Sequence, residues 1–275
     1  MGSSRSDSQS SSLISSLFSI IGLLAGAAVV ADGSREPKVP CYFIFGDSLF
    51  DPGNNNNLNT TMKANYPPYG VDFPSGVATG RYSNGRTTAD IIGELLGFES
   101  FIPPFASAPN NSEILVGVNY ASGSAGLLLE TGKFMRMHVM GARKVGVTGL
   151  NLIGCTPAAI AMYGDKDLLC VDSMNKLVVP FNERLKAIID KLNVRFTDAK
   201  FVYLDSVTAG GIAGQAFPIK STACCKVSLA TGMCIPNVEP CKTRRAHAFW
   251  DAFHPSEAAS RLIAPFYLRA LKKIL

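Results

Sequence analysis

The chain has 275 residues, enough for one large domain or two small ones with a buried core. Hydrophobic residues make up 47% of it and charged residues 17%, which excludes a disordered or collagen-like protein. The formal net charge is only +5, without a dense stripe of lysine and arginine. We therefore expect a globular protein that does not bind nucleic acid.

The first 31 residues are predicted to be a secretory signal peptide. Residues 13–31 are apolar or small without a single charge, and a polar segment follows them at once. The alternative is an uncleaved membrane anchor, because the stretch approaches the length that spans a bilayer. Its three serines and its glycine-alanine end favour cleavage. We expect a secreted, extracellular chain without a stable membrane span after cleavage.

Glycosylation sequons and cysteines agree with this destination. The sequons are Asn59-Thr60-Thr61 and Asn110-Asn111-Ser112. The chain has seven cysteines, of which six form a late group and a nearer pair: Cys224, Cys225, Cys234, Cys241, Cys155 and Cys170. A zinc site is the alternative for the late group, but its spacings lack the paired C-x-x-C form. Disulfides are therefore predicted, with at least one cysteine left unpaired and the pairing open.

Strands and helices alternate after the leader. Strands are expected at residues 42–45, 114–120, 144–150 and 200–205, and helices at 85–97, 171–192 and 255–275. Gly97 is expected to cap the first helix and Ser256 the last, and Pro180 predicts a kink or a second start in the middle one. Residues 206–250 are expected to be a loop. This order predicts an α/β sandwich around a mainly parallel sheet, in a single domain of residues 32–275.

Three residues far apart in the sequence form a candidate catalytic set. Ser48 follows the first predicted strand at its carboxyl end, where α/β folds bind ligands, although a serine there can also be a simple helix cap. Asp251 and His254 lie three residues apart in the segment FWDAFHP. Serine hydrolysis needs an imidazole to take the serine proton and a carboxylate to fix the imidazole tautomer.

The other histidines are weaker candidates. His247 follows two arginines and is expected at the solvated surface, and His138 lies in a Met-rich stretch without nearby acidic residues. Neither the G-x-S-x-G elbow nor a Walker A, H-E-x-x-H or G-x-G-x-x-G motif occurs in the sequence. His254 is therefore the candidate base.

Five segments resemble the plant GDSL-type esterase/lipase family of the SGNH hydrolase superfamily. In chain order they are residues 46–55 (beginning GDSL), 80–86 (GRYSNGR), 117–126 (GVNYASGSAG), 141–157 and 249–259 (FWDAFHPSEAA). The resemblance covers nearly everything from Val39 to Leu275. It implies a three-layer α/β/α sandwich with a mainly parallel, flavodoxin-like sheet.

The resemblance also implies a role for each site residue. Ser48 would be the nucleophile of an acyl-enzyme, His254 the general base and Asp251 its orienting partner. The backbone N–H groups of Ser48 and Gly123 would form the oxyanion hole. The implied substrate is a small-molecule or lipid ester, and neither a metal nor an organic cofactor is expected.

One part of the family pattern is missing. The family's third block, a strand that ends in Gly-x-Asn-Asp, supplies an asparagine to the oxyanion hole, and this sequence contains no Asn-Asp pair. We expect an internal deletion near residues 132–139 that removes a core strand. The alternative function is therefore a non-catalytic secreted remnant, or a protein that binds a lipid or a wall polymer, from a deleted splice form or gene model.

Overall fold

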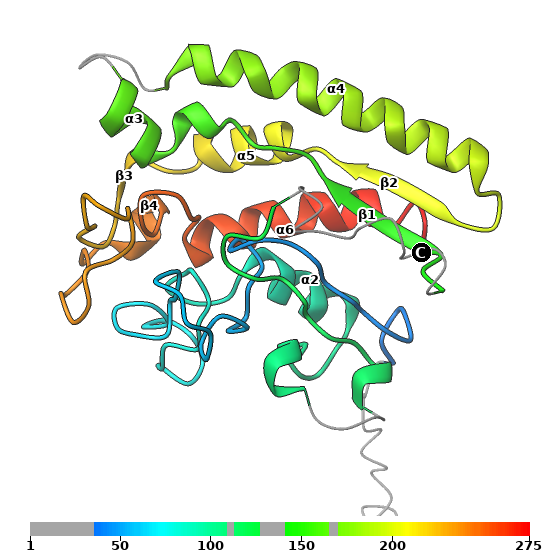
Figure 1. Cartoon of the computed structure of the whole chain (residues 1–275), viewed down its shortest axis with the longest axis horizontal. Helices are drawn as coiled ribbons and strands as arrows, with labels where there is room; N and C mark the ends of the chain where they lie inside the picture. The colour runs from blue at the N-terminus through cyan, green and yellow to red at the C-terminus, as the bar shows by residue number, and fades with distance from the viewer. Residues whose placement is uncertain (1–35, 109–112, 127–140, 165–169) are drawn as a thin grey trace, which may run out of the picture. The chain divides into compact units, whose positions relative to one another are not determined.

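The computed structural model describes residues 36–108, 113–126, 141–164 and 170–275 (Figure 1). The predicted signal peptide, the sequon at Asn110 and the expected deletion near 132–139 lie outside these ranges. Residues 37–275 form one compact unit. Among the described residues, no helix combines the length and the apolar character that a membrane crossing requires.

Two parallel strands lie between the helices of the fold. β1 (Lys144–Thr148) and β2 (Lys200–Leu204) are hydrogen-bonded in parallel, with Lys144 opposite Lys200 and Thr148 opposite Leu204. Their sequences KVGVT and KFVYL are rich in the β-branched and aromatic residues that favour extended backbone. Both strands were predicted from the sequence and are confirmed.

Helices cover the two faces of this strand pair (Figure 1). Helix α4 (Asp172–Arg195) contacts β2, and Asn193 on it bonds the backbone of Phe201. Helix α6 (Glu257–Leu271) packs with Val202 and Leu204, which point to the opposite face because side chains alternate along a strand. The arrangement confirms the predicted three-layer sandwich with parallel strands.

The main core lies between α2 (Thr88–Leu96), α6 and β2. It includes Ile91 and Ile92 of α2 together with Ala264 and Leu268 of α6. Gly97 ends α2 in the left-handed region at φ 96°, and the Ser256 side chain caps α6 by accepting from the Ala259 N–H. Both caps confirm the prediction.

Helix α4 continues through Pro180 as one helix of 24 residues, so the expected second start is wrong. Pro180 is exposed, and the carbonyl that loses its helical partner there can be solvated by water.

The remaining short elements are α3 (Pro157–Tyr163) and the 3-10 turns η1 (Phe105–Ser107), η2 (Glu113–Leu115), η4 (Ile153–Cys155) and η5 (Arg244–Ala246).

The two strands expected at 42–45 and 114–120 are wrong in extent. Tyr42 and Ile44 donate their N–H groups to the Val116 and Val118 carbonyls, but only an isolated parallel bridge, between Ile44 and Asn119, results. Residues 113–115 form η2 instead. Within the described ranges, the pairing of these two segments yields an isolated bridge and no ladder of consecutive residue pairs, so neither segment is a regular strand.

The loop expected at 206–250 contains a helix and two strands. Helix α5 (Ser206–Gln215) packs on α6, and β3 (Ile219–Ala223) pairs in parallel with β4 (His247–Phe249). The sequence of α5, SVTAGGIAGQ, is rich in small residues and has no apolar stripe, so its pattern does not indicate a helix.

Six cysteines form three disulfides, which confirms the preference for disulfides over zinc. The pairs are Cys155–Cys170, Cys224–Cys241 and Cys225–Cys234. Cys41 is free in the described part of the chain, which includes all seven cysteines. The two late disulfides belong to a second core cluster around Trp250, Tyr69 and Tyr82, directly beneath the candidate site.

Candidate active site

Ser48 lies on a turn that follows the Ile44 bridge. Asp47 closes this turn: its Oδ1 accepts the Leu49 N–H at 2.9 Å and its carbonyl accepts the Phe50 N–H at 3.3 Å. The Ser48 N–H has no hydrogen-bond partner in the described ranges. The turn therefore presents both the hydroxyl and a free backbone donor of Ser48.

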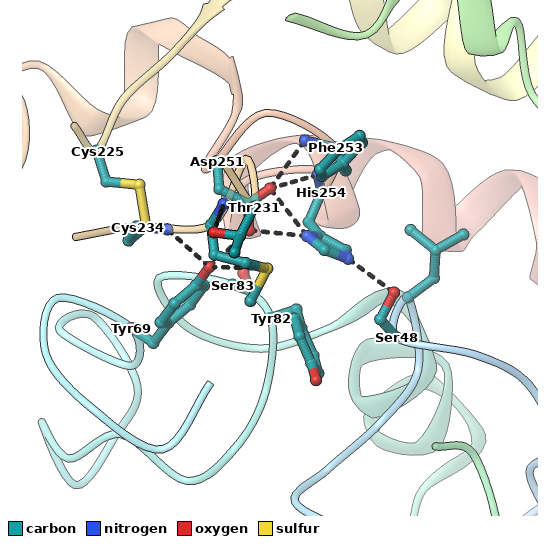
Figure 2. Close-up of polar contacts among 12 residues, drawn as sticks. Ser48, Tyr69, Tyr82, Ser83, Cys225, Thr231, Cys234, Asp251, Phe253 and His254 are labelled. Atoms are coloured by element: carbon teal, nitrogen blue, oxygen red, sulfur yellow. Dashed lines mark hydrogen bonds and ion pairs between the residues drawn. A yellow bond between two sulfur atoms is a disulfide. The ribbon is translucent and has the colours of Figure 1, made fainter. Parts of the chain in front are cut away.

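Asp251 and His254 form a local turn that orients the imidazole (Figure 2). Asp251 is fully buried, and its Oδ1 accepts the backbone N–H groups of Phe253 and His254, both at 2.9 Å. The His254 Nδ1 lies 2.8 Å from each carboxylate oxygen. The three-residue spacing is therefore what allows one carboxylate to bind both the backbone and the ring.

The imidazole links Asp251 to Ser48. The His254 Nε2 lies 2.8 Å from the Ser48 Oγ, a hydrogen bond between residues 206 positions apart (Figure 2). Because Oδ1 already accepts two backbone N–H groups, the arrangement fits a carboxylate that accepts from Nδ1–H, with Nε2 accepting from the serine hydroxyl. The structure thus brings together all three residues that the sequence analysis selected.

Two tyrosines pack around this pair, and the sequence analysis missed both. The Tyr82 ring lies 4.9 Å from the imidazole, and its hydroxyl donates to the Met62 carbonyl at 2.6 Å. The Tyr69 hydroxyl donates to the Asp251 Oδ2 at 2.7 Å. Burial, and after it nearby carboxylates, raises the pKa of both phenols, so both stay protonated. No motif or spacing in the sequence indicates these contacts.

The predicted second oxyanion donor is engaged elsewhere. The Gly123 N–H donates to the Asp51 Oδ2 at 2.8 Å, and the other oxygen of Asp51 accepts from Gly53 and Asn54. The assignment of Gly123 to the oxyanion hole therefore gains no support from this geometry, because a fully buried carboxylate takes its donor. Burial raises the pKa of Asp51 although three N–H groups donate to it.

Asparagines of the Asn54–Asn57 run tie this loop to the segment around Gly123. The Asn54 side chain donates to the carbonyls of Asn119 and Ala121, and that of Asn55 donates to the Gly123 carbonyl. The first and second motif blocks are therefore joined by side-chain to backbone bonds.

Metal ligands are sparse in the described ranges. The group close enough to share an ion consists of Cys224, Cys241 and His247, and the two cysteines are joined to each other as a disulfide.

His247 is buried at 7% exposure in β4, so its expected surface position is wrong. His138 lies outside the described residues.

Comparison with known proteins gives the same family throughout. The family model described as GDSL-like Lipase/Acylhydrolase matches residues 129–265, which contain Asp251 and His254. GDSL esterase/lipase At2g19050 of Arabidopsis thaliana is 32% identical to this chain, over 86% of the chain and 90% of its own length. GDSL esterase/lipase At1g33811 is 34% identical over 88% and 90%, and At1g29660 is 33% identical over 83% and 86%, both from the same plant.

The chain belongs to the GDSL esterase/lipase family. This membership confirms the resemblance that its motif blocks suggested. The alignment with At2g19050 runs over 321 positions, against 275 residues in the chain. At least 46 positions of that alignment therefore hold a residue of the relative and none of this GDSL protein.

Proposed function

We propose that this GDSL protein is a secreted hydrolase of carboxylic esters that works through a Ser48 acyl-enzyme. The observation that carries the proposal is the continuous hydrogen-bonded chain from Ser48 through His254 to the buried Asp251. The relatives are named as esterases/lipases, which supports the same reaction.

The geometry gives each residue a step. The Ser48 Oγ attacks the ester carbonyl carbon while the His254 Nε2 takes its proton, and Asp251 stabilises the imidazolium that forms. The imidazolium then gives the proton to the departing alcohol, which leaves an acyl group on Ser48. Water repeats the sequence with His254 as base, releasing the acid and restoring Ser48. His254 takes up and returns the proton in each of these steps.

This site has few hydrogen-bond donors to stabilise the oxyanion. The free Ser48 N–H is available, the Gly123 N–H donates to Asp51, and the sequence lacks the Asn-Asp of the third block. Loss of one oxyanion donor costs about 10² to 10³ in turnover. We therefore expect slow turnover rather than none.

The apolar side chains beside the triad favour an ester with an apolar acyl group. Leu49, next to the nucleophile, is 42% exposed, and Phe253, next to the base, is 40% exposed. Apolar atoms that stay in contact with water gain free energy when an acyl chain covers them.

The missing block is part of the proposal. An internal deletion near residues 132–139 is supported by the excess length of the alignment with At2g19050. It is also supported by β1, whose hydrogen-bonded neighbour in the described ranges is β2 alone, and by Phe43 and Phe45, each 41% exposed. A strand between residues 42–45 and β1 would pair with both edges.

Secretion is supported by the charge-free segment 13–31 and by three disulfides, which persist in oxidising compartments. Expression in a plant secretory system and N-terminal sequencing of the medium form tests it. We expect a mature chain that begins at residue 32 and carries a glycan on the exposed Asn59. A chain that stays in the cell with its leader intact contradicts secretion.

Hydrolysis of 4-nitrophenyl butyrate by the purified chain tests the reaction. We expect slow release of nitrophenol that His254→Ala and Ser48→Ala both abolish, because both belong to one proton-transfer unit. Release that survives in both variants contradicts the triad. No release from the wild-type chain favours the non-catalytic alternative.

A further inference from the structure

The Asp251 carboxylate receives a hydrogen bond from outside its own turn. Three of its donors come from Phe253 and His254, which are its near neighbours in the sequence. The fourth is the Tyr69 hydroxyl, 182 positions away in the sequence and 2.7 Å from Oδ2 (Figure 2). Tyr69 thus approaches the carboxylate from a different segment of the chain.

Tyr69 is itself held on several sides. Its side chain is 1% exposed, and its hydroxyl accepts the backbone N–H of Cys234 at 3.1 Å. Cys234 is fixed by its disulfide to Cys225, and the rings of Tyr66 and Tyr82 pack edge-on against Tyr69 at 5.3 and 6.2 Å. The thioether sulfur of Met233, a weak acceptor, lies 3.6 Å from the hydroxyl, whereas the Asp251 Oδ2 lies at 2.7 Å and is the stronger acceptor for the phenol's proton.

The direction of that proton follows from the burial. Desolvation first and the charge of Asp251 second raise the pKa of Tyr69 above its ordinary value, so the phenol is protonated at neutral pH. A neutral phenol that accepts from the Cys234 N–H donates its own proton to the Asp251 carboxylate.

We propose that Tyr69 is a positioning residue of the active site, which fixes the Asp251 carboxylate and disperses part of its charge. The proposal rests on the proposed function, since Asp251 matters through His254. Without the phenol, the buried carboxylate has one donor fewer and binds the imidazolium more strongly. Tyr69 therefore keeps His254 a weaker base than Asp251 alone would make it.

The groups that face the imidazole limit what else can move its titration. In the described part of the chain they are the Asp251 carboxylate, the Ser48 hydroxyl, the ring of Tyr82, whose phenol donates to the Met62 carbonyl, and the uncharged ring of Phe253. Tyr69 acts from behind Asp251. Tyr66 lies beside it but donates to the Cys234 carbonyl at 3.0 Å, which makes Tyr66 a matched control.

The test is an NMR titration of the His254 ring in Tyr69→Phe, Tyr66→Phe and the wild-type chain, with His254→Asn to assign the signal. We expect the midpoint in Tyr69→Phe to rise by roughly 0.5 to 1 pH unit, and the midpoint in Tyr66→Phe to stay at the wild-type value. A Tyr69→Phe midpoint equal to the wild-type one overturns the proposal.

A second variant covers the case in which Tyr69→Phe does not fold. Incorporation of 3-fluorotyrosine at position 69 keeps the ring and the acceptor for Cys234 but makes the phenol a stronger donor, so the midpoint should fall below the wild-type value. An unchanged or higher midpoint overturns the proposal.

Reaction with a fluorophosphonate probe separates this proposal from the proposed function. We expect the labelling rate of Tyr69→Phe to fall about tenfold, the scale of a single hydrogen bond, and its acid limb to move to higher pH. A wild-type chain that is not labelled contradicts the hydrolase function, whereas the NMR midpoints still decide the coupling of Tyr69 to His254. A labelling rate and acid limb identical to those of wild type contradict the role of Tyr69.

Discussion

At position 123 the structure leaves room for glycine only. A Cβ there would overlap the Tyr82 hydroxyl and lie 2.7 Å from the Asn55 side chain. Tyr82 packs against the ring of His254, the proposed base, so a displacement of Tyr82 by a larger residue 123 would move that ring as well. The small residue in the second motif block thus serves close packing of two blocks, in addition to the hydrogen bond that its N–H gives to Asp51.

We predict that Gly123→Ala lowers the rate of fluorophosphonate labelling at least tenfold, because Tyr82 must move away from His254. The control is Gly211→Ala in α5, where an added Cβ meets no atom within 4 Å. This change should leave labelling unaltered and stabilise the chain by about 0.4 to 1 kcal/mol. Equal labelling of both variants contradicts the steric account.

Among the elements, the start of α2 depends on one buried ion pair. Thr87 and Asp90 form a reciprocal capping box, and Asp90 accepts two hydrogen bonds of 2.8 Å from Arg81. The guanidinium also lies 4.7 Å from the centre of the Phe73 ring and donates to the Pro52 carbonyl. Arg81 therefore joins the helix to the loop that follows Ser48.

Arg81→Met should destabilise the chain by about 3 to 5 kcal/mol, because it leaves the buried Asp90 charge without its partner. Arg143→Met is the matched control, since the Arg143–Asp198 pair is about half exposed and such pairs contribute about 0 to 1 kcal/mol. Urea unfolding of both variants measures the difference. Similar losses in the two variants contradict the importance of burial.

The pair of Asp72 and Arg244 predicts a pH dependence of stability. Burial alone would raise the pKa of Asp72, but hydrogen bonds from Arg244 and Asn84 hold it below its ordinary value. The unfolded chain then binds the proton more readily, so the stabilisation is complete above the unfolded pKa of about 3.9 and is lost as the pH falls towards the folded value.

Urea unfolding of the wild-type chain and of Asp72→Asn should therefore differ most above pH 5 and converge as the pH falls below about 4. Arg244→Gln removes the same ion pair, and its stability difference from the wild-type chain should disappear over the same pH range. A difference that stays constant down to pH 3 contradicts the assignment of the shift to this pair.

The sequence predicts those elements whose signal is local. β1, β2, α2 and α6 follow from apolar patterns and caps, and the Asp-x-x-His spacing follows from one turn. Helix α5 lacks an apolar stripe, and the strands at 42–45 and 114–120 depend on partners that sequence cannot place. Tyr69 and the bond between Asp51 and Gly123 were unpredictable for the same reason, because long-range contacts leave no periodic signal.

At the scale of the whole molecule, the proposed loss of a strand near residues 132–139 would account for several observations together. The alignment with a relative exceeds the length of the chain, β1 has one hydrogen-bonded neighbour in the described ranges, and Phe43 and Phe45 are each 41% exposed.

We predict that the gene or an alternative transcript encodes at least 46 more residues near positions 132–139, including an Asn-Asp pair. Sequencing the locus and its transcripts across this region tests directly whether the additional coding sequence exists. A locus whose coding sequence is continuous there, with no additional reading frame beside it, contradicts the deletion.

The central claim is that Ser48 is an activated nucleophile despite the missing block. Its most direct test is the reaction of the purified chain with a fluorophosphonate, followed by mass spectrometry of the tryptic peptides, with Ser48→Ala as control. The geometry of Ser48, His254 and Asp251 predicts a single phosphonylated residue, Ser48, and no label in Ser48→Ala. An unlabelled wild-type chain, or equal labelling of both chains, would contradict it.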